Sequence, residues 1–193
     1  MSDHLQKESS AKMMVRERVQ GYSGYEQKAH RSTTDQRLRE HLVSGITRIA
    51  GELQAFSDRL KEGDAAKQVG AIAKIEKKLR TVTDSLGAPA YEAHEFFDLE
   101  KIDREKLDRL YEYDHALVEK LQDLTDEVAA LQGNGLSAYT RSSQGLPGSA
   151  HIGQGFPTDT AEDPLTPLRD LIDGFNQDLF EREILIAGET EQF

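Results

Sequence analysis

Apolar residues recur every three or four positions over most of the chain, which is the period of an amphipathic helix. The first stripe follows Thr33, whose hydroxyl can form a capping box with Gln36, and a helix stop stands at Gly63. A second stripe predicts a helix over residues 65–86, ended by Gly87. The first stripe consists of Leu38, Leu42, Ile46, Ile49, Leu53, Phe56 and Leu60, and the second of Val69, Ile72, Ile75, Leu79, Val82 and Leu86.

Only Gly63 and Asp64 separate these two predicted helices. A connection this short favours an antiparallel helical hairpin, with Asp64 capping the second helix. One continuous helix that is kinked at Gly63 is the alternative.

A third helix is predicted over residues 98–131, where Phe97 before the cap and Ile102 in the first turn can form a hydrophobic staple. Its stripe has the spacing of a heptad seam and contains one acid, Asp114. A polar residue in such a seam often fixes register or oligomeric state, so we assign that role to Asp114, unless Tyr113 turns inward in its place. The stripe reads Leu107, Leu110, Asp114, Leu117, Leu121, Leu124, Val128 and Leu131.

Periodicity is lost over residues 133–163, which are rich in Gly, Ser, Pro and Thr and are predicted to form a disordered linker. Residues 164–193 then predict an amphipathic helix joined to the bundle by this tether. Such a helix needs a groove to be stable, supplied either by the same chain or by another molecule. We expect it to bind a protein partner through Leu168, Ile172, Phe175 and Leu179. The acids Asp170, Asp173, Asp178 and Glu181 would then face basic residues at the rim of the partner's groove.

The N-terminal segment, residues 1–31, contains the motif Gly21-Tyr22-Ser23-Gly24-Tyr25, which predicts a turn that presents two aromatic rings. The tyrosines either cover the end of the bundle or dock on a partner or on membrane headgroups, and we include Tyr22 and Tyr25 among the candidate partner-binding residues. This motif leading into a charged helix resembles small coiled-coil accessory proteins of bacteria, some of which accompany membrane-stress and phage-shock systems. The resemblance assigns no functional residue.

Composition agrees with one soluble domain and excludes several kinds of chemistry. The 193 residues include 7% aromatic residues and no Cys or Trp, which removes disulfides, thiolate catalysis and Cys-bound metals. The formal net charge of −11 disfavours general nucleic-acid binding. No apolar run is long enough to cross a bilayer, and charged residues interrupt the first twenty positions, so we predict a cytoplasmic location.

Two groups of residues suggest chemistry without completing a site. Glu112 and His115 have the spacing used by helical di-iron proteins, but the chain has no second Glu-x-x-His pair, so we predict no metal centre or cofactor. Residues 91–98 gather His94 with acids and aromatics between two predicted helices, which fits a corner loop better than a pocket rim.

We therefore predict an all-α fold: an elongated antiparallel helical bundle or coiled coil of three long helices within residues 32–132, plus the tethered C-terminal amphipathic helix. The predicted function is that of a non-catalytic scaffold or adaptor that forms a homo-oligomer and binds a protein through its C-terminal helix. One alternative is a peripheral membrane-associated accessory protein that uses Met13, Met14, Val15, Tyr22 and Tyr25 with Lys12, Arg16 and Arg18. The other is a carboxylate and histidine metal-binding protein that uses Glu112, His115 and the acids near His94.

Overall fold

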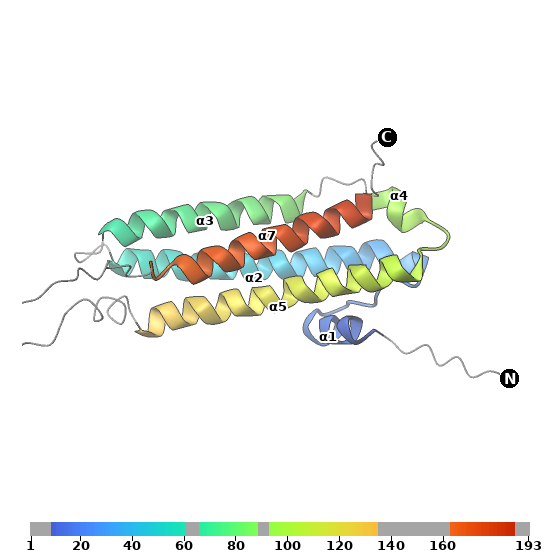
Figure 1. Cartoon of the computed structure of the whole chain (residues 1–193), viewed down its shortest axis with the longest axis horizontal. Coiled ribbons are helices and arrows are strands. Elements are labelled where there is room, and N and C mark those ends of the chain that lie inside the picture. Colours follow the sequence, from blue (N-terminus) through green and yellow to red (C-terminus); the bar gives the residue numbers. More distant parts are fainter. Residues whose placement is uncertain (1–8, 61–65, 89–92, 135–162, 188–193) are drawn as a thin grey trace, which may run out of the picture.

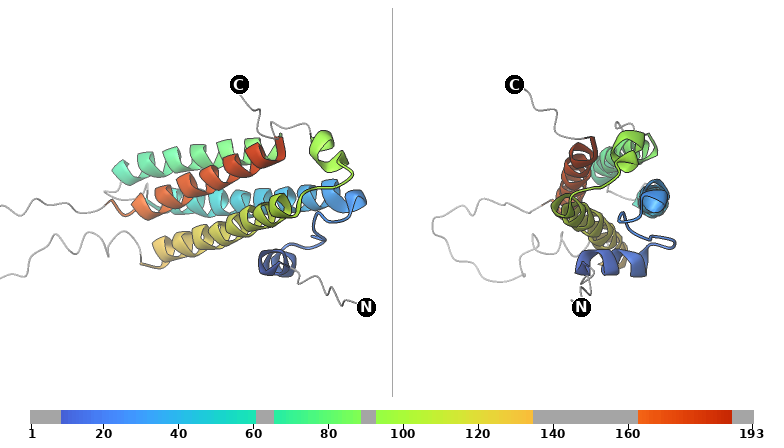
Figure 2. Two further views of the ribbon diagram at one scale, coloured as in Figure 1. Left: turned by 45° about the vertical axis from the view of Figure 1, so that its right-hand side comes forward. Right: turned by 90° about the vertical axis from the view of Figure 1, so that its right-hand side faces the viewer.

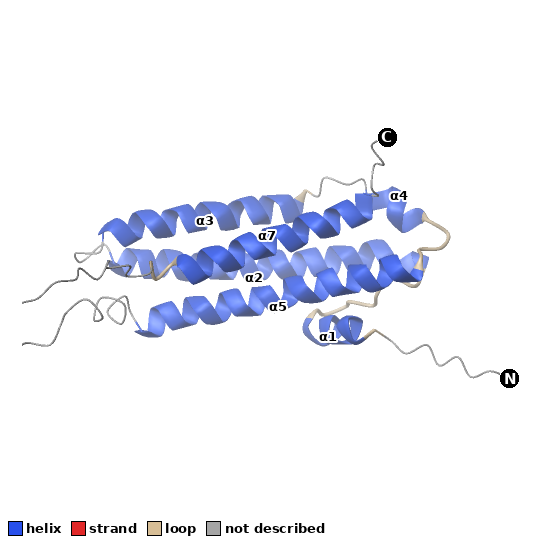
Figure 3. Cartoon of the chain, in the orientation of Figure 1, coloured by secondary structure: helices blue, strands red, loops and turns tan. Residues whose placement is uncertain are grey.

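The computed structural model describes residues 9–60, 66–88, 93–134 and 163–187, and all regular secondary structure in these ranges is helical (Figures 1 and 3). The prediction of an all-α bundle is confirmed. Of the described elements, four long helices lie along the long axis of the molecule, and two short helices and one 3-10 turn lie near one end (Figure 1). The elements are α1 (Ser10–Arg18), η1 (Lys28–His30), α2 (Arg31–Leu60), α3 (Ala66–Gly87), α4 (Ala93–Asp98), α5 (Arg104–Asn134) and α7 (Thr166–Ala187).

The first two long helices, α2 and α3, run in opposite directions and pack along most of their length (Figure 1). The hairpin prediction is therefore right, and the continuous kinked helix is wrong. Helix α2 begins at Arg31, before the predicted capping box, so Thr33 and Gln36 lie inside the helix. The start is fixed by tertiary contacts instead, since Thr34 donates a hydrogen bond to the Gly24 carbonyl oxygen at 3.1 Å.

The predicted third helix is divided in two. Residues up to Asp98 form the short α4, and α5 begins only at Arg104, so a helix start at Asp98 is wrong. Phe97 at the end of α4 and Ile102 within the break are both buried, so both belong to the core. From Leu110 to Leu131 the seam side chains, Asp114 included, are buried as the stripe predicts.

Helix α7 is the fourth long helix of the bundle. It runs antiparallel to α5, packs most closely against that helix and also contacts α3 and α4 (Figure 1). Its 22 residues bury seven side chains against the same chain: Leu168, Ile172, Phe175, Leu179, Arg182, Leu185 and Ile186. The groove that covers the predicted recognition face thus belongs to this chain in the structure.

Close packing in the middle of the bundle depends on one glycine. A Cβ atom at Gly45 of α2 would lie 2.6 Å from a methyl carbon of Leu121 on α5, so a side chain there would require Leu121 to shift. Helix α1 covers α5 from outside through Val15. The predicted linker over residues 133–163 lies almost wholly outside the described residues.

Candidate functional site

The Gly21–Tyr25 motif forms a tight turn that directs both tyrosines into the bundle. Gly21 and Gly24 have φ angles of 82° and 89°, a region that favours glycine. A Cβ atom at Gly24 would lie 2.5 Å from Cε of Lys12 and 2.9 Å from the hydroxyl of Tyr111. Only glycine therefore fits here, and the predicted turn is present.

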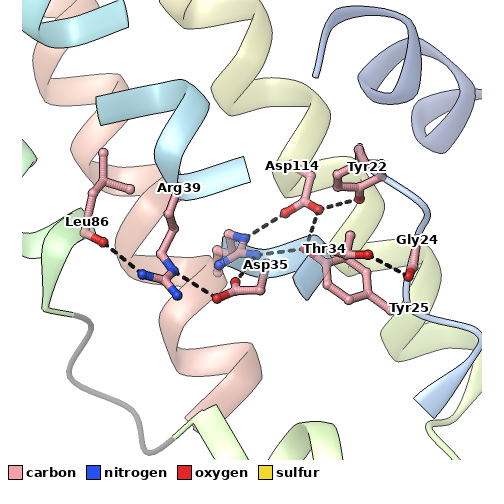
Figure 4. Close-up of polar contacts among 9 residues, drawn as sticks. Tyr22, Gly24, Tyr25, Thr34, Asp35, Arg39, Leu86 and Asp114 are labelled. Atoms are coloured by element: carbon pink, nitrogen blue, oxygen red, sulfur yellow. Dashed lines mark hydrogen bonds and ion pairs between the residues drawn. The ribbon is translucent and has the colours of Figure 1, made fainter. Parts of the chain in front are cut away.

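Asp114 of α5 accepts hydrogen bonds from both of these tyrosines. The Tyr22 and Tyr25 hydroxyls donate to the same carboxylate oxygen, the latter at 2.8 Å. The other oxygen accepts from Nε of Arg182 at 2.6 Å. One seam carboxylate therefore joins the N-terminal turn, α5 and α7 (Figure 4).

Arg182 extends the contacts to α2. One terminal nitrogen of its guanidinium group donates to Asp35 at 2.7 Å and to the Tyr25 hydroxyl at 3.0 Å. The second Asp35 oxygen accepts from Arg39 at 2.8 Å, and Arg39 reaches the Leu86 carbonyl oxygen at the end of α3 (Figure 4). We call Tyr22, Tyr25, Asp35, Asp114 and Arg182 the buried polar cluster. It connects α2, α5, α7 and the turn.

Aromatic contacts and Arg31 enclose the cluster. The Tyr25 ring stacks between Phe97 and Tyr111, with centroid distances of 5.9 and 5.7 Å. Arg31 donates hydrogen bonds to the carbonyl oxygens of Tyr25 at 2.7 Å and Leu99 at 2.6 Å. The turn is thus attached to the start of α2 and to the segment that follows α4.

Burial and charge act on the two acids of the cluster in different ways. Burial would raise the pKa of Asp35, but Arg182 and Arg39 outweigh it and hold the pKa below its ordinary value. Burial raises the pKa of Asp114, and the opposing influence of Arg182 and the two tyrosines does not cancel this. Burial, followed by the charge of Asp114, raises the pKa of Tyr22 and of Tyr25 well above 10.0. Both tyrosines therefore remain neutral donors.

The cluster is closed to solvent, because each of its five residues is at most 2% exposed. A cavity of about 620 Å³ lies beside it, between α1, η1 and α5. Tyr111 and the ion pair of Lys12 with Glu26, at 3.0 Å, line this cavity together with Ser9, Ser23 and Ile102. Of the cluster's five residues none lines it, so an occupant of this cavity meets Tyr111 and not Asp114.

The sequence-predicted partner-binding residues are all buried in the structure. Tyr22 and Tyr25 contact Asp114, and Leu168, Ile172, Phe175 and Leu179 pack in the core of the same bundle. That they bind another protein stays a prediction. Asp114 occupies the seam as predicted, while Tyr113 is only half-buried and donates a hydrogen bond to Glu181 at 3.0 Å.

Sequence reasoning missed Asp35 and Arg182, although a signal for both was present. Arg182 follows Leu179 by three positions and so continues the apolar stripe of α7, and Asp35 precedes Leu38 by three positions in the stripe of α2. A cation in one stripe and acids in two others are complementary charges on buried faces. Pairing the cation of one stripe with the acids of the other two would have predicted the cluster.

The other candidate chemistry gains no support. The described residues contain no group of three His, Asp or Glu side chains that could hold a metal ion. His115 lies 3.4 Å from Glu119, one turn further along α5, and Glu112 is exposed. The His94 side chain lies outside the described residues. Of the residues proposed for membrane contact, Lys12, Val15, Tyr22 and Tyr25 are buried, and within the described helices no segment meets the length and apolarity of a membrane span.

Comparisons of the chain with protein-family models, with curated proteins and with solved structures give no match.

Proposed function

We propose that the chain is a non-catalytic helical scaffold, a rigid four-helix body that holds its outer surfaces in fixed positions for contacts with proteins. The observation that carries this proposal is the closed state of the buried polar cluster. Its acids, its arginine and its tyrosines are bonded to one another and withdrawn from solvent.

Groups with shifted pKa values often mark active sites, but they act on substrates only where a substrate can reach them. Here Asp114 is fully buried, and Arg182 is 1% exposed. A buried ion pair is weak evidence for net stability, and we infer that this one fixes the arrangement of the helices, because helices in a wrong register would leave a charge unpaired. The cluster therefore favours a structural role that fixes which helix lies where.

The same geometry favours a scaffold over an adaptor with a releasable recognition helix. To present Leu168, Ile172 and Phe175 to another protein, α7 must leave the bundle and withdraw Arg182 from Asp35 and Asp114. Release of α7 would therefore break both ion pairs and expose the seven buried side chains of α7 to water. Contacts with other proteins are accordingly assigned to the outer surfaces.

Deletion of residues 164–193 tests this proposal through circular dichroism and thermal unfolding. A scaffold in which α7 is an integral helix loses more helical signal than the 22 residues of α7 account for, and its cooperative unfolding transition is lost. A truncation after Ala187 is the matched control and keeps both. An intact bundle with an unchanged melting temperature after the larger deletion contradicts the scaffold and supports a recognition helix.

A further inference from the structure

Large apolar side chains that stay on the surface of the described residues are grouped. On α1, Met13 and Met14 are 48% and 46% exposed, and on α7, Phe180 and Ile184 are 58% and 41% exposed. With Leu99, these are the five large exposed apolar side chains in the described part of the chain. Phe180 and Ile184 lie one turn apart on the same helix face. Neighbouring exposed apolar residues commonly mark contact sites.

The two faces carry opposite charge. Arg16 and Arg18 flank the methionines of α1, and Glu17, the one acid of that helix, lies one turn after them on the same face, so this face has two cations against one acid. Helix α7 has five acids against two arginines, of which Arg182 is buried in the cluster. The acids are Asp170, Asp173, Asp178, Glu181 and Glu183. Within the chain Asp173 pairs with Lys78, Asp178 pairs with Lys120, and Glu181 accepts hydrogen bonds from Tyr113 and Gln177, so Glu183 is the acid on which the opposite charge of this face depends.

Glu183 is the acid next to Ile184, and it is half-buried. Burial raises the pKa of its carboxyl group. A cation brought to this face from outside would favour the charged form of Glu183. The face around Phe180 and Ile184 thus suits an apolar surface that is rimmed by arginines.

Within one molecule these two faces lie on different sides of α5. Figure 2 shows α1 on one side of that helix and α7 on the other, and both pack directly against it. The outer face of α1 therefore does not meet the outer face of α7 in the same chain. In two copies of the chain they are free to meet.

We propose that the outer face of α1 in one copy, Met13, Met14 and Arg18, docks on the outer face of α7 in a second copy, Phe180, Glu183 and Ile184. This contact rests on the scaffold function proposed above, because both helices must be held fixed on the body. Two different faces make it heterologous, so a pair of copies keeps one free α1 face and one free α7 face, and further copies can be added. A nine-residue helix offers a small contact. We therefore place the association at the weak end of protein interfaces, below about 1,200 Å² of total buried area.

Cysteine cross-linking of the full chain captures such a weak contact, and the chain contains no Cys that would interfere. Met14→Cys and Phe180→Cys are made as separate variants and oxidised alone and as an equimolar mixture. The expected result is a disulfide-linked dimer of the two variants that is several-fold more abundant in the mixture than in either variant alone. Met14→Cys mixed with Thr81→Cys, at an exposed position on α3, is the matched control and gives only background.

Added salt and the substitution Arg18→Glu should each reduce the mixed dimer several-fold, because the contact is between opposite charges. Equal yields with Thr81→Cys, or efficient cross-linking of Phe180→Cys alone, overturn the proposed pairing of faces. So does flotation of the wild-type chain with anionic vesicles through Met13 and Met14 in the absence of a mixed dimer, which would assign the α1 face to a membrane. None of these outcomes alters the result of deleting α7, so the scaffold proposal is judged separately.

Discussion

The two ends of the four-helix bundle are held together by different kinds of interaction. At the end where α2 and α5 begin, the buried polar cluster joins α2, α5 and α7 through directional hydrogen bonds and ion pairs. At the opposite end, the same helices meet mainly through buried apolar side chains, such as Leu53, Leu131 and Leu168, although Gln132 of α5 also donates a hydrogen bond to the Glu52 carbonyl oxygen at 3.3 Å. The apolar end supplies area removed from water, whereas the polar end specifies which helices meet and in which register.

This difference predicts how each end responds to substitution, and the largest effect belongs to Arg182. Arg182→Ala leaves Asp35 and Asp114 buried without their shared cation, and we expect a loss of about 3–5 kcal/mol in the free energy of unfolding. Denaturant unfolding measures it. Arg169→Ala on the same helix, where Arg169 pairs with Asp163 at the surface, is the control and should cost less than about 1 kcal/mol. Equal losses at the two positions would remove the distinction between them.

Conservative substitutions distinguish the packing at one end from the directional hydrogen bonds at the other. At the apolar end, Leu53→Ala should cost about 2–5 kcal/mol, and Leu53→Met less than about 1.5 kcal/mol, because shape and hydrophobicity are nearly kept. At the polar end, Arg182→Lys should cost almost as much as Arg182→Ala, since an ammonium group cannot reproduce the fork that meets Asp114 and Asp35 together. If Arg182→Lys kept the free energy of unfolding of the wild type, the positive charge at this position, and not the direction of its hydrogen bonds, would be what stabilises the polar end.

The smallest effect concerns the tyrosines at high pH. The pKa values of Tyr22, Tyr25 and Tyr111 are raised above 10.0, with burial as the main cause, so the native state retains protons that the unfolded chain releases. Stability is therefore complete below pH 10.0 and falls as the pH rises above it. Tyrosinate absorbance should show three of the six tyrosines titrating only on unfolding. Titration of all six near 10.0 with helicity retained would contradict the closed cluster.

The sequence predicted the apolar end better than the polar end. A stripe of apolar residues shows that one face of a helix is buried, and the predicted bounds of α3 agree with the structure within one residue. The stripe does not show what covers that face. The sequence therefore could not decide whether α7 docks in a groove of its own chain or of another molecule. The break between α4 and α5 was missed because the staple residues Phe97 and Ile102 are buried whether or not the helix continues.

Asp114 illustrates the limit most clearly. Its place among seam leucines marks it as unusual, and from the stripe alone Asp114→Leu should raise the melting temperature or change the oligomeric state. The structure reverses that expectation, because leucine would leave Arg182 without one of its two carboxylates and both tyrosine hydroxyls without their acceptor. Its partners come from positions 68 to 92 residues away in the chain, which no local pattern joins.

Amide hydrogen exchange on the full chain measures whether the buried polar cluster makes α7 an integral part of the bundle. We expect amides of α7 to be protected to the same degree as those of α2 and α5, and Arg182→Ala to accelerate exchange in α7. Exchange of α7 at the rate of an unstructured peptide, with α2, α3 and α5 still protected, would contradict this integral role of α7.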